Sequence, residues 1–378
     1  MTSRRILFLR IEPAGYILAL LRALRDLWPG EIDAQFISTG ATQAWDFDGS
    51  EIGVSVLPVG NAKGKAAVRA MISERPPDLV HAAGWGAPAC WAAITSAKSA
   101  GIPVVVDHDT WADAASGAKA LVKRLVLPWM LRRVTHFAPG GSRQAAFLRR
   151  YGVSDAQITP INMTVDVVAI QRYLEANPGA GIEFRRAHGL PEDAQIVLFL
   201  ARLVPRKGLE DLLEAWSKLM ISRPDVLLVI AGDGPLRADL ERKVPLGVSF
   251  VGRLAGPEVW HAYAAADIFV APSRREPWGL TINEAMAAGL PVVMTDAFGC
   301  IGDLAVADET ACIVPASQPE KLKAGIEKVL DDDAYRIRLL ANAKRLIAMW
   351  TIEEEARRIV AIWLDLLEGR AESLVEKD

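Results

Sequence analysis

The chain has 378 residues, 51% of them hydrophobic and 24% charged, and a net charge of −3. This composition excludes a largely disordered chain, and a chain of this length usually folds as two domains. No run reaches 18 apolar residues, and the first apolar run, Ile6 to Leu9, is followed by charged residues, so we expect neither a transmembrane helix nor a signal peptide.

Three cysteines, Cys90, Cys300 and Cys312, lack paired metal-ligand spacing, which favours a reducing cytoplasm. The charge is unevenly distributed. Residues 1–170 hold 18 Lys and Arg against 14 Asp and Glu, whereas the remainder holds 25 against 32. This asymmetry suggests an anionic partner for the first half.

Short apolar runs alternate with amphipathic stretches along the whole chain, which predicts parallel sheets covered by helices. In the first half, helices are expected at 16–27 and 62–74, and the strand-like runs are RILFLR, DAQFIST, PDLVHAAG, IPVVVDH and VTHFAPG. In the second half the runs are AQIVLFLARL, DVLLVIAGDG, VSFVGRL, ADIFVAPS, LPVVMTD and ACIVPA.

Two doubly wound domains follow from this repetition, with a linker expected within 165–183, where NPGAG interrupts the pattern. We therefore predict an N-terminal domain at 1–172 and a C-terminal domain at 173–350. A last helix, about 351–368 within the segment 351–378, could pack back on the first domain. Ligands of open parallel sheets bind beyond the carboxyl ends of the strands.

One such strand end in the first half is VVVDHDTW, which contains Asp107, His108 and Asp109. Two carboxylates around an imidazole could bind a metal, but no further ligand cluster is evident in the sequence. A structural histidine is another interpretation. We predict no metal site.

A later segment of the first half, GAKALVKRLVLPWMLRRVTHF, combines five Lys and Arg residues with leucines and Trp129. It could rest on anionic lipid and present a lipid-linked acceptor. The alternative is a helix pair that packs on the core and turns a basic face outward.

Two cations follow the first strand of the second half, in ARLVPRKGLEDLLEAW. Arg202 and Lys207 flank a turn that leads into a helix, an arrangement suited to a diphosphate. A solvated basic loop is the alternative. The later IAGDGP lacks the third glycine of a dinucleotide fingerprint, which disfavours a nicotinamide oxidoreductase. In VSFVGRL, a strand end at Val251 and Arg253 could border a flat base.

The segment REPWGLTINEAMAAGLPVV carries the strongest signal. Gly279 and Leu280 are expected at a helix start, where free backbone N–H groups favour an anion. Glu276 precedes this helix and Glu284 lies about one turn inside it. Both carboxylates could accept hydrogen bonds from an extended, polyhydroxylated ligand. The alternative is that both are solvated acids.

These motifs, in this order, resemble the family 4 retaining glycosyltransferases of the GT-B fold, most closely over residues 190–330. The resemblance implies two Rossmann-like doubly wound domains that face a cleft. It departs from the family pattern at DAFGCIGDLA, where Cys300 and Asp303 replace glycine and glutamate, and at RIEPAGYI, where one glycine replaces a glycine pair.

The resemblance also implies roles for individual residues. The diphosphate, the donor sugar and the ribose are assigned to Arg202 with Lys207, to Glu276 and to Glu284, respectively. His108 is placed near the reacting carbon, while Gly15 and Asp109 are assigned to the acceptor. The full predicted donor set is Arg202, Lys207, Val251, Arg253, Glu276, Trp278, Gly279, Leu280, Thr281 and Glu284, and the predicted catalytic set is His108, Glu276, Arg202 and Lys207.

The predicted function is transfer of a sugar from a nucleoside-diphosphate sugar to a glycan or lipid-linked acceptor, with retention and without a metal. We expect no cofactor and no nucleic-acid partner, and a cytoplasmic location with peripheral contact to the inner face of an anionic membrane. A sugar-nucleotide epimerase or hydrolase and a non-catalytic sugar-nucleotide-binding subunit are the alternatives.

Overall fold

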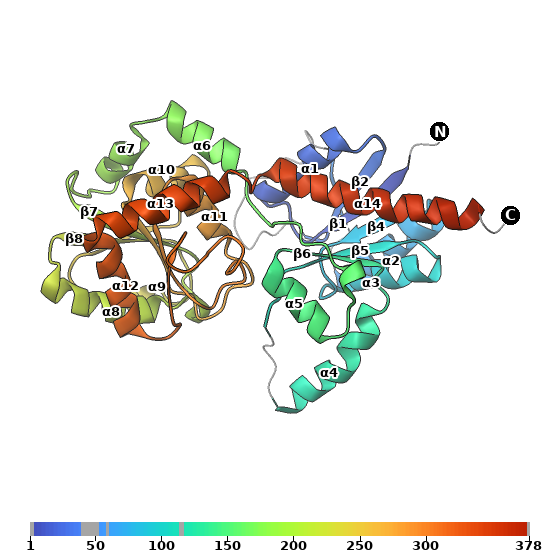
Figure 1. The fold of residues 1–378 in the computed structure, drawn as a ribbon, viewed down its shortest axis with the longest axis horizontal. Helices are drawn as coiled ribbons and strands as arrows, with labels where there is room; N and C mark the ends of the chain where they lie inside the picture. The colour runs from blue at the N-terminus through green and yellow to red at the C-terminus, as the bar shows by residue number, and fades with distance from the viewer. Residues whose placement is uncertain (1–3, 39–52, 58–59, 113–116, 376–378) are drawn as a thin grey trace. The chain divides into compact units, whose positions relative to one another are not determined.

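The structure is a computed structural model that describes residues 4–38, 53–57, 60–112 and 117–375. It divides into two compact units: unit 1 is Met1–Met163 with Ile352–Asp378, and unit 2 is Thr164–Thr351. In the described residues, each unit holds one six-stranded sheet, and all the strands pair in parallel (Figure 1). The two predicted Rossmann-like doubly wound domains are therefore present.

Unit 1 has the strand order β3-β2-β1-β4-β5-β6. Its strands are β1 (Arg5–Arg10), β2 (Glu31–Phe36), β3 (Ser55–Val56), β4 (Leu79–Ala82), β5 (Val104–His108) and β6 (His136–Pro139). Its helices are α1 (Gly15–Leu27), α2 (Asn61–Glu74), α3 (Pro88–Ser99), α4 (Gly117–Leu131), α5 (Ser142–Arg150) and α14 (Ile352–Val375). The helices predicted at 16–27 and 62–74 are confirmed within one residue.

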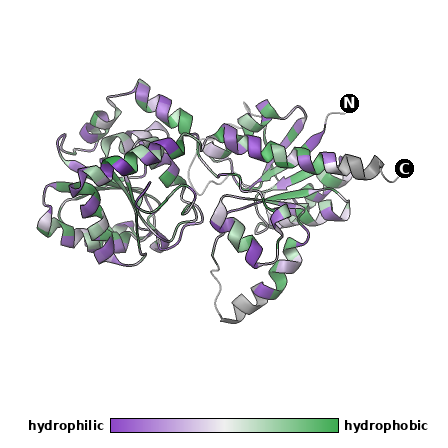
Figure 2. Ribbon diagram, in the orientation of Figure 1, coloured by the Kyte–Doolittle hydropathy of each residue, from purple (hydrophilic) through white to green (hydrophobic). Residues whose placement is uncertain are grey.

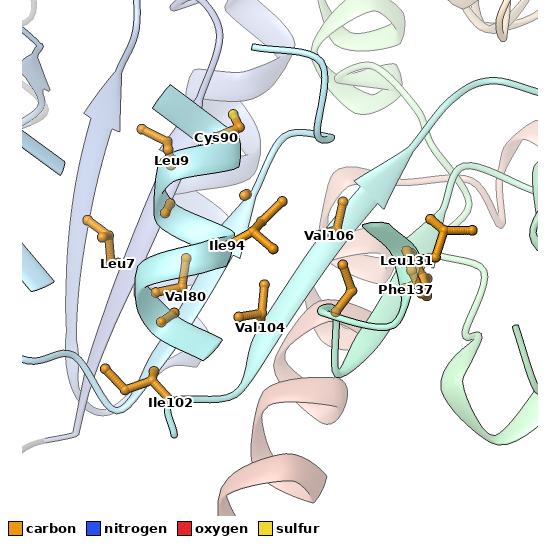
Figure 3. Packing of buried hydrophobic residues seen from close by; sticks show 14 of the residues in the cluster. Leu7, Leu9, Val80, Cys90, Ile94, Ile102, Val104, Val106, Leu131 and Phe137 are labelled. Carbon is orange, nitrogen blue, oxygen red and sulfur yellow. The ribbon is translucent and has the colours of Figure 1, made fainter. Parts of the chain in front are cut away.

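Strand β1 shows why the apolar runs are continuous. Leu7 and Leu9 point into one core cluster, which Figure 3 shows with α3 and β5. Ile6 and Phe8 point to the opposite face of the sheet, into a second cluster that includes α1 and α14. A strand buried on both faces needs apolar residues at every position. The hydropathy colouring in Figure 2 shows such apolar strands inside more polar helices.

Helix α14 packs against α1 and closes the second cluster with Trp363. The indole Nε1 donates a hydrogen bond to His81 Nδ1 at 3.1 Å. An indole only donates, so His81 carries its proton on Nε2 and donates it to Asp107 Oδ1 at 2.6 Å. Asp107 also pairs with the buried Arg10. Burial, with a smaller contribution from the Arg10 charge, holds the pKa of His81 well below its usual range.

Unit 2 has the strand order β12-β11-β10-β7-β8-β9. Its strands are β7 (Gln195–Leu200), β8 (Val226–Ala231), β9 (Val248–Gly252), β10 (Ile268–Ala271), β11 (Val292–Thr295) and β12 (Cys312–Val314). Its helices are α6 (Val167–Ala176), α7 (Ala180–Ala187), α8 (Leu209–Ser222), α9 (Arg237–Glu241), α10 (Pro257–Ala265), α11 (Leu280–Ala287), α12 (Pro319–Asp331) and α13 (Asp333–Ile347).

The unit boundary falls at 163/164 and not at the predicted 172/173, and the segment 165–183 contains α6 and the start of α7 in place of a linker. Asp166 caps α6 by accepting a hydrogen bond from Ala169 N at 2.9 Å. Val167 and Ile170 bury one face of the helix, which packs against α10 and α11. The Pro-Gly sequence separates these two helices, and both belong to unit 2.

Among the described residues, none of the helices combines the length and the hydropathy needed to cross a membrane. Even the 24-residue α14 carries several acidic and basic side chains along its length.

Replacing Trp363 with Phe removes the donor to His81 Nδ1 and leaves a buried acceptor without a partner. We expect a loss of about 1–3 kcal/mol in the free energy of unfolding, measured by urea denaturation followed by circular dichroism. Trp129→Phe, on an exposed tryptophan of the same unit, is the matched control. A Trp363→Phe variant no less stable than this control would contradict the role of the buried hydrogen bond.

Candidate functional site

The strand order of unit 2 places its candidate site. The chain runs outward from β7 to β8 and β9 on one side, and from β10 to β11 and β12 on the other, so β7 and β10 are neighbours at the point where the order reverses. Doubly wound sheets bind ligands beyond the carboxyl ends of the strands at this point. The loops after β7 and β10 contain Arg202, Lys207 and Glu276, so the topology brings the main predicted residues together.

The loop after β7 turns through a short 3-10 helix, Pro205–Lys207, and enters α8 at Gly208. Gly208 has φ +69°, and a Cβ there would lie 2.0 Å from the Pro272 carbonyl oxygen of the loop after β10. Only glycine lets the two loops approach this closely. Lys207 is half-buried, and Arg202, earlier in the same loop, is exposed.

Lys207 Nζ lies 2.5 Å from Glu276 Oε2, and Arg206 Nη1 lies 3.3 Å from the same oxygen. The side chains of Lys207 and Glu276 are only 14% and 12% exposed. The backbone of Glu276 is fixed as well, since its N–H donates to Ala297 O and its carbonyl accepts from Gly299 N. The AFG part of the atypical DAFGCIGDLA segment therefore supports Glu276.

Helix α11 begins directly after this loop. Gly279 is the N-cap residue with φ +105°, and a Cβ there would lie 2.5 Å from the Phe298 ring. Because glycine has no side chain, α11 starts without a side-chain cap, and its first turn contains no acidic residue. The first N–H groups, at Leu280 and Thr281, are thus available to an anion. Thr281 and Lys207 line one small cavity of about 10 Å³.

Trp278 has a place different from the one predicted. Its indole is 2% exposed, stacks on Trp350 with ring centroids 5.5 Å apart, and donates from Nε1 to Asn283 Oδ1 at 3.0 Å. The side chain holds the loop onto the core of unit 2. Any donor contact at this position would have to use the backbone.

Glu284 lies one turn into α11, and Tyr263 of α10 donates its hydroxyl to Glu284 Oε2 at 2.8 Å. Tyr263 is fully buried. Burial raises the pKa of Glu284 to about 7, against a smaller lowering by the tyrosine hydrogen bond. The carboxyl group therefore changes charge near neutral pH.

Val251 and Arg253 mark the end of β9, two strands from β7. Adjacent strands lie about 4.8 Å apart, so this end is roughly 10 Å from the end of β7. Arg253 is exposed and Val251 is half-buried. They lie at the same carboxyl edge of the sheet as the residues after β7 and β10.

In unit 1, β5 ends at His108, which is only 5% exposed. Its ring stacks on Trp85 with centroids 4.6 Å apart and lies 5.1 Å from the Phe147 ring. This aromatic packing fits the structural interpretation of His108, and its predicted sugar contact stays a prediction.

The two carboxylates that flank His108 differ in their surroundings. Asp107 forms an ion pair with Arg10 and accepts a hydrogen bond from His81. It therefore does not join Asp109 and His108 around a shared ligand. Asp109 is exposed, and its carbonyl accepts from Gln144 at 3.4 Å. Gly15 is exposed at the first position of α1. Both predicted acceptor residues are accessible.

Two family models match the chain. The model described as Glycosyl transferases group 1 matches residues 182–346, and the model described as Glycosyl transferase 4-like domain matches residues 13–164. Both models describe glycosyltransferase domains, and together they match most of both units of the chain.

Solved glycosyltransferase structures share the GT-B fold of this chain over nearly its whole length. One is Anabaena Alr3699/HepE in complex with UDP and glucose, at TM-score 0.76 and 19% identity, covering 96% of this chain and 100% of that one. Another is sucrose-phosphate synthase from Thermosynechococcus elongatus, at TM-score 0.77 and 19% identity, covering 97% and 100%.

Curated relatives are similar over shorter stretches. The uncharacterized glycosyltransferase MJ1607 of Methanocaldococcus jannaschii is 36% identical over 43% of each chain. A GDP-mannose-dependent phosphatidylinositol monomannoside mannosyltransferase of Corynebacterium glutamicum is 31% identical over 52% of this chain and 54% of its own length. The matches thus span about half the length of these relatives.

Sequence reasoning did not identify Tyr263 or Arg206 as partners of the two glutamates. Each lies more than 20 positions from its partner, and no local pattern marks such a pair. The strand order was the missing information.

The raised pKa of Glu284 predicts a pH-dependent stability. Its ordinary pKa is 4.5, so between about pH 4.5 and 7 the folded state binds more protons than the unfolded state. The free energy of unfolding therefore falls as pH rises through this window. Urea denaturation at about pH 5, 6, 7 and 8 gives the free energy of unfolding of the native chain minus that of Glu284→Gln, and this value should fall as pH rises. Glu214→Gln, at an exposed position of α8, is the control. A value that rises with pH would refute the assignment.

Proposed function

We propose that this protein is a glycosyltransferase that moves a sugar from a nucleoside-diphosphate sugar to a glycan or lipid-linked acceptor, with retention and without a metal. The observation that supports this most is the Lys207–Glu276 pair at the reversal point of the unit 2 sheet, beside the uncapped start of α11. We assign this cation, this acid and the first N–H groups of α11 to one bound donor.

The diphosphate is assigned to Arg202, Lys207 and the first N–H groups of α11. A lysine ammonium has three donors, so Lys207 can keep Glu276 and still donate to a phosphate oxygen. The exposed Arg202 can close over the same group in a forked geometry. These positive groups neutralise the charge that develops on the leaving nucleoside diphosphate, which is the electrostatic work the reaction needs.

Glu276 is assigned to the hydroxyl groups of the donor sugar. Its carboxylate is held by Lys207 and Arg206 through one oxygen, Oε2. Glu284, which Tyr263 holds in the same way, is assigned to the ribose. Val251 and Arg253 then border the base at the end of β9, so the donor would run along the carboxyl edge of the sheet.

Retention rests on the family resemblance. The acceptor oxygen forms its bond to the anomeric carbon on the face from which the nucleoside diphosphate departs. The acceptor proton passes to a phosphate oxygen of the leaving group. The side chains named here bind and orient the donor; His108 is assigned a contact near the reacting carbon.

The relatives support the donor class. Anabaena Alr3699/HepE has been solved with UDP-glucose, and a Mycobacterium tuberculosis relative, 27% identical over 73% of this chain and 70% of its own length, is described as a GDP-mannose-dependent alpha-mannosyltransferase. UDP-glucose and GDP-mannose are both nucleoside-diphosphate sugars. We assign the same donor class to this chain.

A thermal-shift panel of nucleoside diphosphates and their sugar conjugates should show stabilisation by at least one nucleotide. A ligand that binds the folded state alone at 100 times its Kd stabilises it by about 2.7 kcal/mol. Glu284→Ala should lose most of this response, whereas Glu214→Ala should keep it. If no nucleotide shifts a folded sample, the donor site is wrong.

Glu276→Ala should abolish sugar transfer while the protein stays folded. Loss of one contact to the transition state costs about 3–4 kcal/mol, a rate decrease of about 10²–10³. Transfer is measured by release of nucleoside diphosphate with and without acceptor, with Glu210→Ala as the exposed control. Release of free, epimerised donor in the absence of acceptor would favour the epimerase alternative. Near-normal turnover of Glu276→Ala would contradict the proposed contact between Glu276 and the donor sugar.

A further inference from the structure

An open groove lies between α3 and α4 of unit 1, and its lining includes neither Gly15 nor Asp109, the predicted acceptor residues. It has a volume of about 510 Å³. Its residues are Trp91, Thr95, Lys98, Ser99, Trp129, Arg132 and Arg133, and we call it the α3–α4 groove. Three cations and two indoles thus face one concave surface.

The α3 side of the groove is one helical stripe. Trp91, Thr95 and Lys98 recur at helical spacing and therefore share a face. Lys98 is exposed at the last turn, while other positions of α3, among them Cys90 and Ile94, are buried in the core (Figure 3). The three side chains of this stripe are therefore not part of the buried core of unit 1.

Helix α4 also has two faces. Leu127 and Leu131 are buried in the core cluster. On the other side, Leu125 is 71% exposed and Trp129 is 53% exposed, one turn apart. The helix extends away from the sheet of unit 1 (Figure 1). Exposed leucine and tryptophan on a projecting helix indicate a surface that a partner covers.

The positive charge around α4 limits which class of partner could bind this surface. The chain contains no Asp or Glu between Asp113 and Asp155, a stretch that holds eight Lys and Arg residues. The guanidinium carbon of Arg133 lies 3.4 Å from the centroid of the Trp129 ring, so a cation and an indole are held together. Such an indole suits the headgroup level of a bilayer, with the cations at the phosphates.

We propose that α4 and the α3–α4 groove form a docking surface for anionic phospholipid in a bilayer. Leu125 and Trp129 enter the interface, and Lys98, Arg132 and Arg133 contact phosphate groups. The charge-complementary partner is a surface with many anions, because the cations are spread over two helices. The surface lies within unit 1 and does not depend on the proposed sugar transfer.

Co-sedimentation with vesicles tests the surface. The native chain should bind vesicles of phosphatidylcholine mixed with phosphatidylglycerol, should bind pure phosphatidylcholine weakly, and should be released by salt. The double variant Lys98→Glu with Arg132→Glu should bind at least about fivefold more weakly for each charge, since each contributes about 1 kcal/mol. Leu125→Ala with Trp129→Ala should lose binding at every salt concentration.

Two matched controls lie on unit 2. Ile221 and Leu246 are 85% and 86% exposed, so changing both to Ala removes exposed apolar side chains elsewhere. Lys344→Glu with Arg345→Glu reverses an equal charge on α13. Both controls should bind anionic vesicles like the native chain.

Binding that is equal for neutral and anionic vesicles, unchanged in the groove variants, or lost equally in the controls would overturn the proposal. Displacement from vesicles by inorganic phosphate at matched ionic strength, with chloride salt as the control, would identify a free phosphate site in place of a lipid surface. The nucleotide thermal shift, run on every variant, shows that each is folded. A missing nucleotide response with normal vesicle binding would count against the donor site alone.

Discussion

The ion pair between Lys207 and Glu276 joins the loops that follow β7 and β10, and the candidate site depends on it. The two residues are 69 positions apart. They meet because the strand order makes β7 and β10 neighbours. The pair also requires Gly208, where any side chain would collide with the Pro272 carbonyl. A largely buried charge pair is costly to form, so its place at a strand-end crevice indicates binding more than stability.

A second buried polar chain organises unit 1. It runs from Trp363 of α14 through His81 to Asp107 and Arg10. Each hydrogen bond fixes the next, because an indole only donates and a carboxylate only accepts. The last helix of the sequence is thereby tied to the first and central strands of the sheet. The charge network sits beside His108, so the same residues that stabilise the core also fix the backbone at this strand end.

The uneven charge of the chain has a local origin. The acid-free stretch between Asp113 and Asp155 holds eight Lys and Arg residues, and without it the first half would not be positive. Part of this stretch is α4, whose exposed face adds Leu125 and Trp129 to the cations. The proposed donor site lies in unit 2, whose overall charge is negative but whose loop after β7 contains Arg202, Arg206 and Lys207. Net charge alone therefore says little about where an anion binds.

The sequence by itself determined the strands other than β3, the helices at 16–27 and 62–74, and the residues after those strands, because apolar runs and glycine turns are local signals. The repeated pattern was enough for two doubly wound domains. Tertiary structure decided the rest: the helices at 165–183, the core position of Trp278, and the partners of Glu284 and Glu276. These features depend on which strands are neighbours and on which faces pack, and residues far apart in sequence set both.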